Sequence, residues 1–198
     1  MKRILYTQRV EAVSGYNERR DCADQQIARF IWSCGFLPIA MNNLPELTAQ
    51  YIEALQPAGI VLTGGNDLAV YGGNAPERDD TESKLLEIAI RDNIPLLGFC
   101  RGMQLLSWYF GAKLMPVTGH VATWHRLNGD FAERKVNSYH NFAVNALPDC
   151  FEVLAQTEDG TIEAIRHRTQ RLLGIMWHPE REPAFSQADV NLFREFFV

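Results

Sequence analysis

The sequence has few cysteines and no excess of positive charge. Its four cysteines, Cys22, Cys34, Cys100 and Cys150, are not closely paired, so they show neither the spacing of a zinc site nor the density of a disulfide-bonded secreted domain. The formal net charge is −5. That charge argues against nonspecific nucleic-acid binding, which needs a basic face that neutralises several phosphates. We expect a protein of a reducing compartment, the cytoplasm.

Long hydrophobic runs are also absent. No apolar run approaches the roughly 20 residues that span a bilayer. The basic residues 1–9 become polar after three apolar residues, which is too short a run for a signal peptide. No repeat, low-complexity tract or linker divides the chain. With 198 residues and 46% hydrophobic content, the chain is long enough for one domain with a substantial core and short for two. We expect residues 1–198 to form one soluble domain.

Short apolar runs alternate with segments of helical period, which is the pattern of βα units around a parallel sheet. The runs predict strands over residues 4–6, 36–39, 59–62, 94–98, 136–139, 151–155, 161–165 and 172–176. The periodic segments predict five helices. The first ends at Gly35, the second spans 47–55 and the third begins at an Asp80 or Thr81 cap. The last two span 103–110 and 190–197. The predicted fold is an α/β fold with an open, mostly parallel sheet flanked by helices.

One predicted strand runs directly into a helix through Gly98-x-Cys100-x-Gly102. Glycines on both sides permit a tight strand-to-helix turn that presents the central side chain, and a helix N-terminus favours the thiolate. This pattern is typical of a nucleophile elbow and predicts that Cys100 is exposed and activated. A buried structural cysteine is the alternative, because that is the usual state of an isolated cysteine.

A second motif supplies partners for the thiol. The strand over residues 172–176 leads into His178, and Glu180 lies two residues later, where a short turn brings its carboxylate back to the imidazole. A base near a thiol, held in one tautomer by an acid, is what covalent acyl transfer requires. A solvated His-Pro-Glu turn is the alternative for this segment alone. The two motifs together predict a Cys-His-Glu triad.

These motifs resemble the signatures of class I glutamine amidotransferases. Residues 98–104 resemble the family's cysteine motif, residues 177–180 its Trp-His-Pro-Glu motif, and residues 63–67 the glycine turn that completes its oxyanion hole. The three motifs occur in the family's order and extend over most of the chain. The resemblance implies a flavodoxin-like sheet and hydrolysis of a γ-glutamyl amide through a thioester.

The same resemblance implies roles for residues around the elbow. The backbone N–H groups of Gly65 and Arg101 are implied as the oxyanion hole, where two preorganised donors commonly contribute a few kcal/mol each. Gln104 is implied to hold the glutamyl group. An ordinary helix position is the alternative for this glutamine.

Within the superfamily, several stretches resemble free-standing hydrolases of the γ-glutamyl-GABA hydrolase type. They include residues 136–140, which are similar to that group's Val-Asn-Ser-x-His stretch. This resemblance implies that Asn66, Tyr139 and His140 contact the substrate. Asn141-Phe142 departs from the His-Gln that members often carry, so the amine side of the substrate stays open.

A narrower resemblance concerns γ-glutamyl-CDP-amidate hydrolases of bacterial capsule phosphoramidate biosynthesis. It is carried by residues 8–9, 16–20 and 64–68 and by the compact length. That group releases glutamate from a nucleotide-linked phosphoramidate and leaves cytidine diphosphoramidate. The resemblance implies that Arg9, Arg19 and Arg20 bind phosphate, which guanidinium groups hold in a bidentate way. Solvated surface arginines are the alternative.

Three functions remain in competition. They are a self-contained γ-glutamyl hydrolase, a glutaminase subunit that delivers ammonia to a partner synthase, and a non-enzymatic relative. The His-Pro-Glu motif disfavours the third, and the absence of a fused synthase domain favours the first. We expect a small γ-glutamyl substrate and no nucleic-acid or membrane partner, and homo-oligomerisation stays open.

The other histidines are expected to be structural or solvated. No Cys, Asp or Glu lies near His120, His125 or His140 in sequence at the spacing of metal ligands. His140 is the best further pocket candidate among them. His167 is flanked by two arginines and is expected to be solvated. The sequence therefore predicts neither a metal nor a cofactor.

Overall fold

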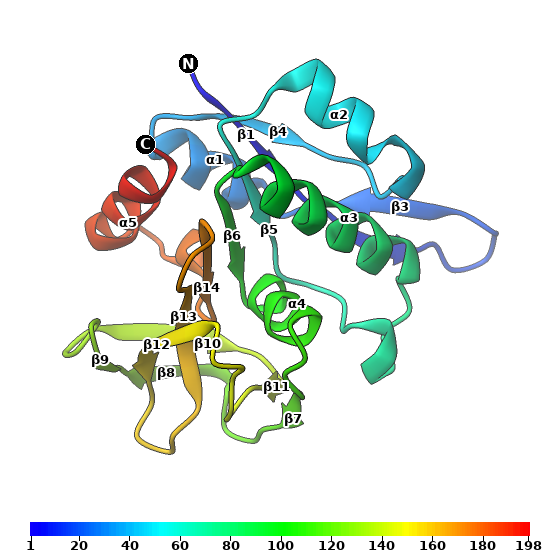
Figure 1. Ribbon diagram of the computed structural model, residues 1–198. Coiled ribbons are helices and arrows are strands. Elements are labelled where there is room, and N and C mark those ends of the chain that lie inside the picture. The colour runs from blue at the N-terminus through cyan, green and yellow to red at the C-terminus, as the bar shows by residue number, and fades with distance from the viewer.

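The computed structural model describes residues 1–198 and is built on an eight-stranded sheet (Figure 1). The strand order is β4-β1-β5-β6-β14-β13-β12-β9. The first five strands are parallel: β4 (Leu37–Ala40), β1 (Arg3–Tyr6), β5 (Gly59–Leu62), β6 (Leu96–Phe99) and β14 (Leu172–Ile175). The other three are antiparallel: β13 (Ile162–His167), β12 (Phe151–Gln156) and β9 (Asn128–Gly129). The predicted open, mostly parallel sheet is confirmed.

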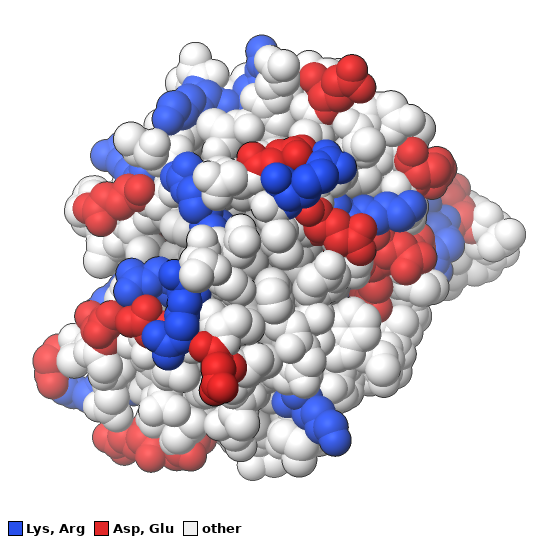
Figure 2. Space-filling view, in the orientation of Figure 1, with Lys and Arg blue, Asp and Glu red and all other residues white.

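Helices cover both faces of the sheet and divide the core in two (Figure 1). One apolar cluster lies under α2 (Thr48–Leu55), α3 (Pro76–Asp92) and α4 (Arg101–Tyr109). The other lies under α1 (Gln25–Ser33) and α5 (Gln187–Phe197). None of these helices has the length and apolar character needed to cross a membrane. On the face shown in Figure 2, basic and acidic side chains are intermixed.

Three small sheets surround the carboxyl ends of the parallel strands. They are the hairpin of β2 (Arg9–Ala12) and β3 (Arg19–Cys22), the pair β8 (Val121–Arg126) and β10 (Lys135–Tyr139), and the pair β7 (Met115–Pro116) and β11 (Phe142–Ala143). Three 3-10 helices complete the chain: η1 (Pro45–Leu47), η2 (Ala69–Tyr71) and η3 (Pro179–Arg181). The β8–β10 and β7–β11 pairs lie together at one end of the molecule (Figure 1).

The predicted element boundaries agree closely with the structure except at two helix starts. The helix expected to begin at Asp80 or Thr81 begins at Pro76, since a proline at the first helical position has a φ that already suits the helix. Thr81 lies inside this helix, where its hydroxyl donates to the Glu77 carbonyl at 2.8 Å. The terminal helix begins three residues before the expected position, at Gln187.

Candidate active site

The predicted catalytic residues come together at the carboxyl ends of the parallel strands, which is where open α/β sheets place their ligand sites. Cys100 follows β6, His178 follows β14, and Gly65 lies in the turn after β5. Their strands are neighbours in the sheet, because β6 lies between β5 and β14. The strand order thus gathers residues that are far apart in sequence.

Cys100 has the backbone geometry of an elbow. Its φ of 51° and ψ of −109° lie outside the wells that non-glycine residues normally occupy, and such strain costs about 1–3 kcal/mol. Its N–H donates to the Ile175 carbonyl of the neighbouring strand at 2.7 Å. The side chain is only 6% exposed, so the expectation of an exposed thiol is wrong. The close packing of the turn by both flanking strands leaves the thiol at the floor of a pocket.

Three glycines around the thiol are required by close approach. A Cβ on Gly98 would lie 2.4 Å from the Gly102 carbonyl carbon, and a Cβ on Gly102 would lie 2.2 Å from the Leu62 carbonyl oxygen. A Cβ on Gly64 would lie 2.7 Å from His178 Cε1. The glycine positions therefore let the elbow, β5 and the imidazole pack against one another.

The imidazole of His178 is oriented from two sides. Its Nδ1 lies 2.7 Å from Glu180 Oε1, and both side chains are buried. Asn137 accepts from the His178 N–H at 2.9 Å and donates to its carbonyl at 2.8 Å. The remaining nitrogen, Nε2, is buried without a hydrogen-bond partner. The sequence stretch around Asn137 pointed to the pocket but did not reveal this role.

The charges around His178 favour its protonated form. Burial is the largest influence and lowers the pKa, but the nearby Cys100 and Glu180 together outweigh it and raise the pKa of His178 to about 9. A neighbouring imidazolium favours the thiolate form of a cysteine, and the imidazolium–thiolate ion pair is the nucleophilic state. The rings of Phe99 and Tyr139 meet the imidazole edge-on, with centroid distances of 5.6 and 5.8 Å.

Backbone donors are available beside the thiol. The N–H groups of Gly65 and Arg101 donate no hydrogen bond within the protein, and both residues line one pocket together with Cys100. Arg101 opens α4, so its N–H belongs to the free first turn of a helix. Two unpaired backbone donors thus belong to residues that line the pocket of the thiol, and their role as an oxyanion hole stays a prediction.

A buried network of ionic side chains supports both donors. We call Arg78, Glu82 and Arg101 the arginine network. Glu82 accepts from Arg78 Nε at 2.9 Å and also pairs with Arg101, and all three side chains are almost fully buried. Arg78 also donates to the carbonyls of Thr63 and Gly64, at 2.7 and 3.0 Å. The network therefore links the elbow to the glycine turn.

The charges of the arginine network depend on one another. Burial opposes ionisation of Glu82, but Arg101 and Arg78 outweigh it and hold the pKa of this carboxyl below its ordinary value. Burial, followed by the charge of Arg101, lowers the pKa of Arg78 to about 10. The Glu82 carboxylate, which contacts both arginines, thus offsets the free-energy cost of burying two guanidinium groups.

The pocket next to the thiol contains most of the predicted substrate-binding residues. Gln104, Tyr139, His140 and Asn66 line it with Cys100. Gln104 Nε2 donates to the Phe142 carbonyl at 2.9 Å, so its amide is held in place. Both ends of the Asn66 amide bond the backbone of Val10 in β2, at 2.8 and 3.0 Å. Asn66 therefore fixes the glycine turn, and its substrate contact stays a prediction.

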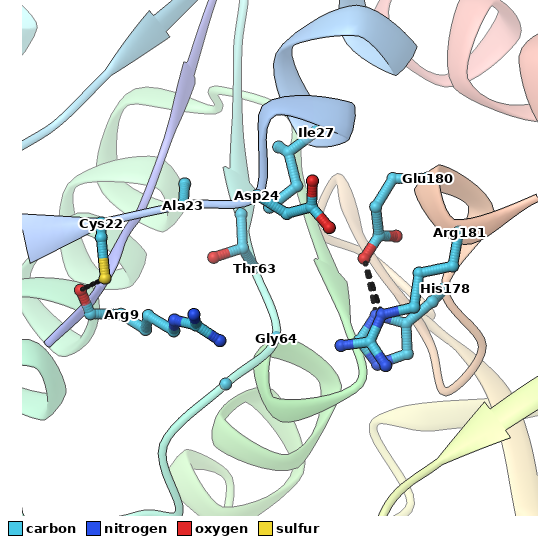
Figure 3. Close-up of a pocket in the computed structure, with 11 residues that line it drawn as sticks. Arg9, Cys22, Ala23, Asp24, Ile27, Thr63, Gly64, His178, Glu180 and Arg181 are labelled. Atoms are coloured by element: carbon cyan, nitrogen blue, oxygen red, sulfur yellow. Dashed lines mark hydrogen bonds and ion pairs between the residues drawn. The ribbon is translucent and has the colours of Figure 1, made fainter. Parts of the chain in front are cut away.

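The three predicted phosphate-binding arginines have different surroundings. Arg9 lines a cleft beside Gly64, Gly65 and His178. Figure 3 shows it on one side of Gly64, with His178, Glu180 and Arg181 on the other. Arg19 pairs with Glu77, and Arg20 pairs with Glu18, and neither lines this cleft or the pocket of the thiol. The structure thus brings only Arg9 to the site.

Arg181 is a cationic residue of the cleft that the sequence analysis missed. It lines the same cleft as Arg9, and its guanidinium lies 4.4 Å from the centre of the Tyr139 ring. Its position directly after Glu180 was the available signal, because a residue next to a triad member lies near the reaction centre.

One expectation about the other histidines is wrong. His167 is buried, packs against Phe110 and Phe151 with ring centroids 5.1 Å away, and accepts hydrogen bonds from the backbone of the following turn. His120 and His140 are buried, and Glu163 approaches both from β13 in space. Sequence spacing could not show this contact, because the three residues belong to different segments.

Comparisons with known proteins agree with the geometry. The family model for glutamine amidotransferase class-I matches residues 21–198. A γ-glutamyl-CDP-amidate hydrolase of Campylobacter jejuni subsp. jejuni is 33% identical, and the match covers 98% of this chain and 96% of that protein. A glutamine-hydrolysing GMP synthase of Streptococcus mutans is 32% identical over 79% of this chain but only 31% of its own length.

Solved structures show the same fold. A protein of Thermoplasma acidophilum, provisionally assigned as one of the subunits of a GMP synthase, aligns with a TM-score of 0.72 and 21% identity, covering 100% of this chain and 93% of its own. A glutamine amidotransferase of Thermotoga maritima aligns with a TM-score of 0.65 and 15% identity, covering 98% of this chain and 83% of its own. At these identities the likeness concerns the fold.

Proposed function

Because the chain belongs to the glutamine amidotransferase class-I family, we propose that it is a cysteine-dependent hydrolase of γ-glutamyl amide bonds. The observation that carries this proposal is the hydrogen bonding of the two ring nitrogens of His178. Its Nδ1 is held by Glu180 at 2.7 Å, while its Nε2 is buried and unpartnered near the strained Cys100 elbow. That nitrogen is free to exchange a proton with the thiol and the leaving amine.

In the first half of the reaction, the Cys100 thiolate attacks the γ-carbonyl carbon of the substrate. A C–S bond forms, and the carbonyl π electrons move to the oxygen, where the N–H groups of Gly65 and Arg101 stabilise the negative charge. The intermediate collapses as the C–N bond breaks. The His178 imidazolium gives its proton to the leaving nitrogen, and a γ-glutamyl thioester remains on the enzyme.

In the second half, neutral His178 takes a proton from water, and the resulting hydroxide attacks the thioester carbon. The C–S bond breaks, L-glutamate leaves, and the thiolate and imidazolium are regenerated. Glu180 keeps the imidazole in the tautomer that places its lone pair at Nε2 and stabilises the imidazolium between the two halves. Gln104, held by the Phe142 carbonyl, lines the pocket where the glutamyl group is to bind.

The class of reaction is tested with Cys100→Ala and a matched cysteine control. We expect turnover of γ-glutamyl amides to fall by at least about 10⁴-fold in Cys100→Ala, with the circular dichroism spectrum unchanged. Cys150→Ala changes a partly buried free cysteine that lines neither the cleft nor the pocket of the thiol, and it should retain activity. Mass spectrometry of an acid-quenched reaction should show the glutamyl adduct in the parent protein and in the control but not in Cys100→Ala. A folded Cys100→Ala protein with substantial turnover would disprove the mechanism.

We further propose γ-glutamyl-CDP-amidate as the substrate, with cytidine diphosphoramidate and L-glutamate as products. The similarity to the Campylobacter jejuni protein over nearly the whole of both chains supports this choice. The cleft adds chemical support, because Arg9 and Arg181 both line it beside His178. A diphosphoramidate would accept charge-assisted hydrogen bonds from these guanidinium groups, and a small neutral amine would not.

The substrate is tested by comparing kcat/KM for γ-glutamyl-CDP-amidate, γ-glutamyl-GABA and L-glutamine. We expect the nucleotide substrate to be preferred, and Arg9→Ala to lower its kcat/KM by about 10-fold or more while the values for the other two change little. Arg166→Ala is a matched control, since Arg166 is an exposed arginine paired with Glu152 on another strand. A clear preference for γ-glutamyl-GABA or L-glutamine would refute the substrate and leave the reaction class intact.

A glutaminase subunit that delivers ammonia to a partner synthase is the second candidate. The similarity to about one third of a glutamine-hydrolysing GMP synthase favours it. This candidate predicts that the isolated chain is inactive and that activity on L-glutamine appears only with a synthase present. Rapid hydrolysis of γ-glutamyl amides by the purified chain alone would exclude it.

A further inference from the structure

A group of buried side chains next to the active site has no role in the proposed reaction. His120 precedes β8, His140 follows β10, and Glu163 lies in β13. We call these three residues the His–Glu cluster. They are 2%, 2% and 0% exposed, and one potential metal-ligand atom of each lies within 4.8 Å of the other two.

The facing atoms of the His–Glu cluster have no hydrogen-bond partners. These atoms are His120 Nδ1, His140 Nε2 and both carboxylate oxygens of Glu163. The distances from Glu163 Oε1 to the two nitrogens are 3.7 and 3.4 Å. A fully buried carboxylate without a partner is strongly unfavourable, and a bound cation would compensate its charge.

The outer nitrogen of each histidine is already held by an acceptor. His120 Nε2 lies 2.8 Å from Asp159 Oδ2, and His140 Nδ1 lies 3.1 Å from the Phe142 carbonyl oxygen. Each outer nitrogen must therefore carry the proton, and in the neutral ring the inner nitrogen presents a lone pair to the Glu163 carboxylate. Histidines that bind metals are usually held in this way through the other nitrogen.

We propose that the His–Glu cluster binds a divalent transition metal of the zinc class through His120 Nδ1, His140 Nε2 and Glu163 Oε1. Two imidazole nitrogens and one carboxylate suit Zn²⁺. In a tetrahedral site with bonds of about 2.0–2.1 Å, ligand atoms are about 3.3–3.4 Å apart. Two of the observed separations, 3.4 and 3.7 Å, are close to this value. The two imidazole nitrogens lie within 4.8 Å of each other, so the imidazoles would move toward each other around the ion. His125 packs against His120 with ring centroids 4.2 Å apart, and its Nε2 is buried without a hydrogen-bond partner.

The position of this site gives the metal a structural role. The ion would join the β8–β10 pair to β13 of the central sheet. The Phe142 carbonyl that holds His140 also accepts a hydrogen bond from the amide of Gln104. The site therefore borders the glutamyl pocket, which His140 also lines. Metal binding should therefore stabilise the fold and fix the pocket wall, without taking part in bond cleavage.

The test uses the tag-free chain carrying Cys100→Ala, which prevents metal from binding the thiol. After EDTA treatment and dialysis, Zn²⁺ and Co²⁺ are titrated at neutral pH. We expect one metal per chain by elemental analysis, the intense visible bands of low-coordinate Co²⁺, and a higher melting temperature with metal. Glu163→Gln in this background should weaken binding by about 100-fold or more, since it removes a ligand. Glu152→Gln, on the adjacent strand and outside the cluster, should bind as the parent does.

A second variant keeps the test decisive if Glu163→Gln fails to fold. Asp159→Asn changes a carboxylate that is 57% exposed and should weaken metal binding about 10–100-fold by releasing His120. The proposal is overturned if the EDTA-treated chain binds neither ion stoichiometrically. It is also overturned if both variants bind metal as tightly as the parent, or if Glu163→Gln stabilises a protein that shows no metal dependence.

Discussion

Glu82→Gln tests whether the arginine network positions the catalytic donors. The change keeps the shape of the side chain and removes its charge. Arg78 and Arg101 would then remain buried without the carboxylate that both of them contact. Of these two cations, Arg101 would keep Asp79 as an acidic partner, whereas Arg78 would keep only neutral acceptors.

The expected loss of stability follows because a buried positive charge would lose its negative partner. Removing one partner of a buried ion pair costs about 3–5 kcal/mol, because the other charge is left uncompensated. For a chain of this length, 1 kcal/mol corresponds to a shift of about 2–4 °C in melting temperature. We therefore expect the melting temperature to fall by about 6–20 °C.

Activity should fall as well, because the arginine network holds the carbonyls of Thr63 and Gly64 and the first residue of α4. Loss of an oxyanion donor commonly costs about 10²–10³-fold in kcat, so partial displacement of two donors should cost about 10-fold or more. The assays are thermal melting and kcat on the folded variant below its transition. Glu87→Gln is the matched control, since Glu87 is exposed in the same helix. An unchanged or higher melting temperature for Glu82→Gln would refute the reasoning.

Three further predictions concern the triad. Steady-state kinetics should show that His178→Asn is nearly as damaging as Cys100→Ala, whereas Glu180→Gln retains more activity because it only orients and stabilises the imidazolium; the reverse order would mean that the base is misassigned. Cys100→Gly should melt at a higher temperature than Cys100→Ala. The relief of about 1–3 kcal/mol of backbone strain exceeds the cost of about 0.5–1 kcal/mol from the greater entropy of the unfolded glycine variant. Equal melting temperatures would show that the elbow is not strained. The pKa of His178 rises from 6.5 to about 9 on folding, so its stabilising effect is complete below pH 6.5 and is lost as the pH rises to about 9. Urea denaturation should therefore show the stability difference between the parent and His178→Asn shrinking over this window, and a difference that grows with pH would contradict the assignment.

The parts of the fold that the sequence predicted are those with a local signal. β5 and β6 are fully buried strands of four residues, and their apolar runs are bounded by turn residues. The elbow was predictable for the same reason, because Gly98 and Gly102 mark a turn that no other residue permits. Such features depend on residues within a few positions of one another, which is the range over which a single sequence is informative.

The parts that were missed depend on contacts between distant segments. The β2–β3 hairpin is polar and largely exposed, so it has no apolar alternation to indicate strands. The depth of the Cys100 thiol depends on packing from β5 and β14, and the pairing of Arg19 with Glu77 depends on where the hairpin lies. In each case the contacting residue belongs to another element, so the spacing of residues along the chain does not indicate the contact.

The strand β10 shows how one short stretch serves two sites. Successive side chains of a strand point to opposite sides, and β10 obeys this rule. Asn137 and Tyr139 face the triad, since the first clamps the backbone of His178 and the second meets its ring. Ser138 faces the other way, and its hydroxyl donates to the His120 carbonyl at 2.8 Å. His140, which follows the strand, belongs to the His–Glu cluster and also lines the pocket of the thiol. A stretch that resembles a single pocket motif thus connects the catalytic base to the proposed metal site, which is why loss of the metal should disturb the pocket next to the triad.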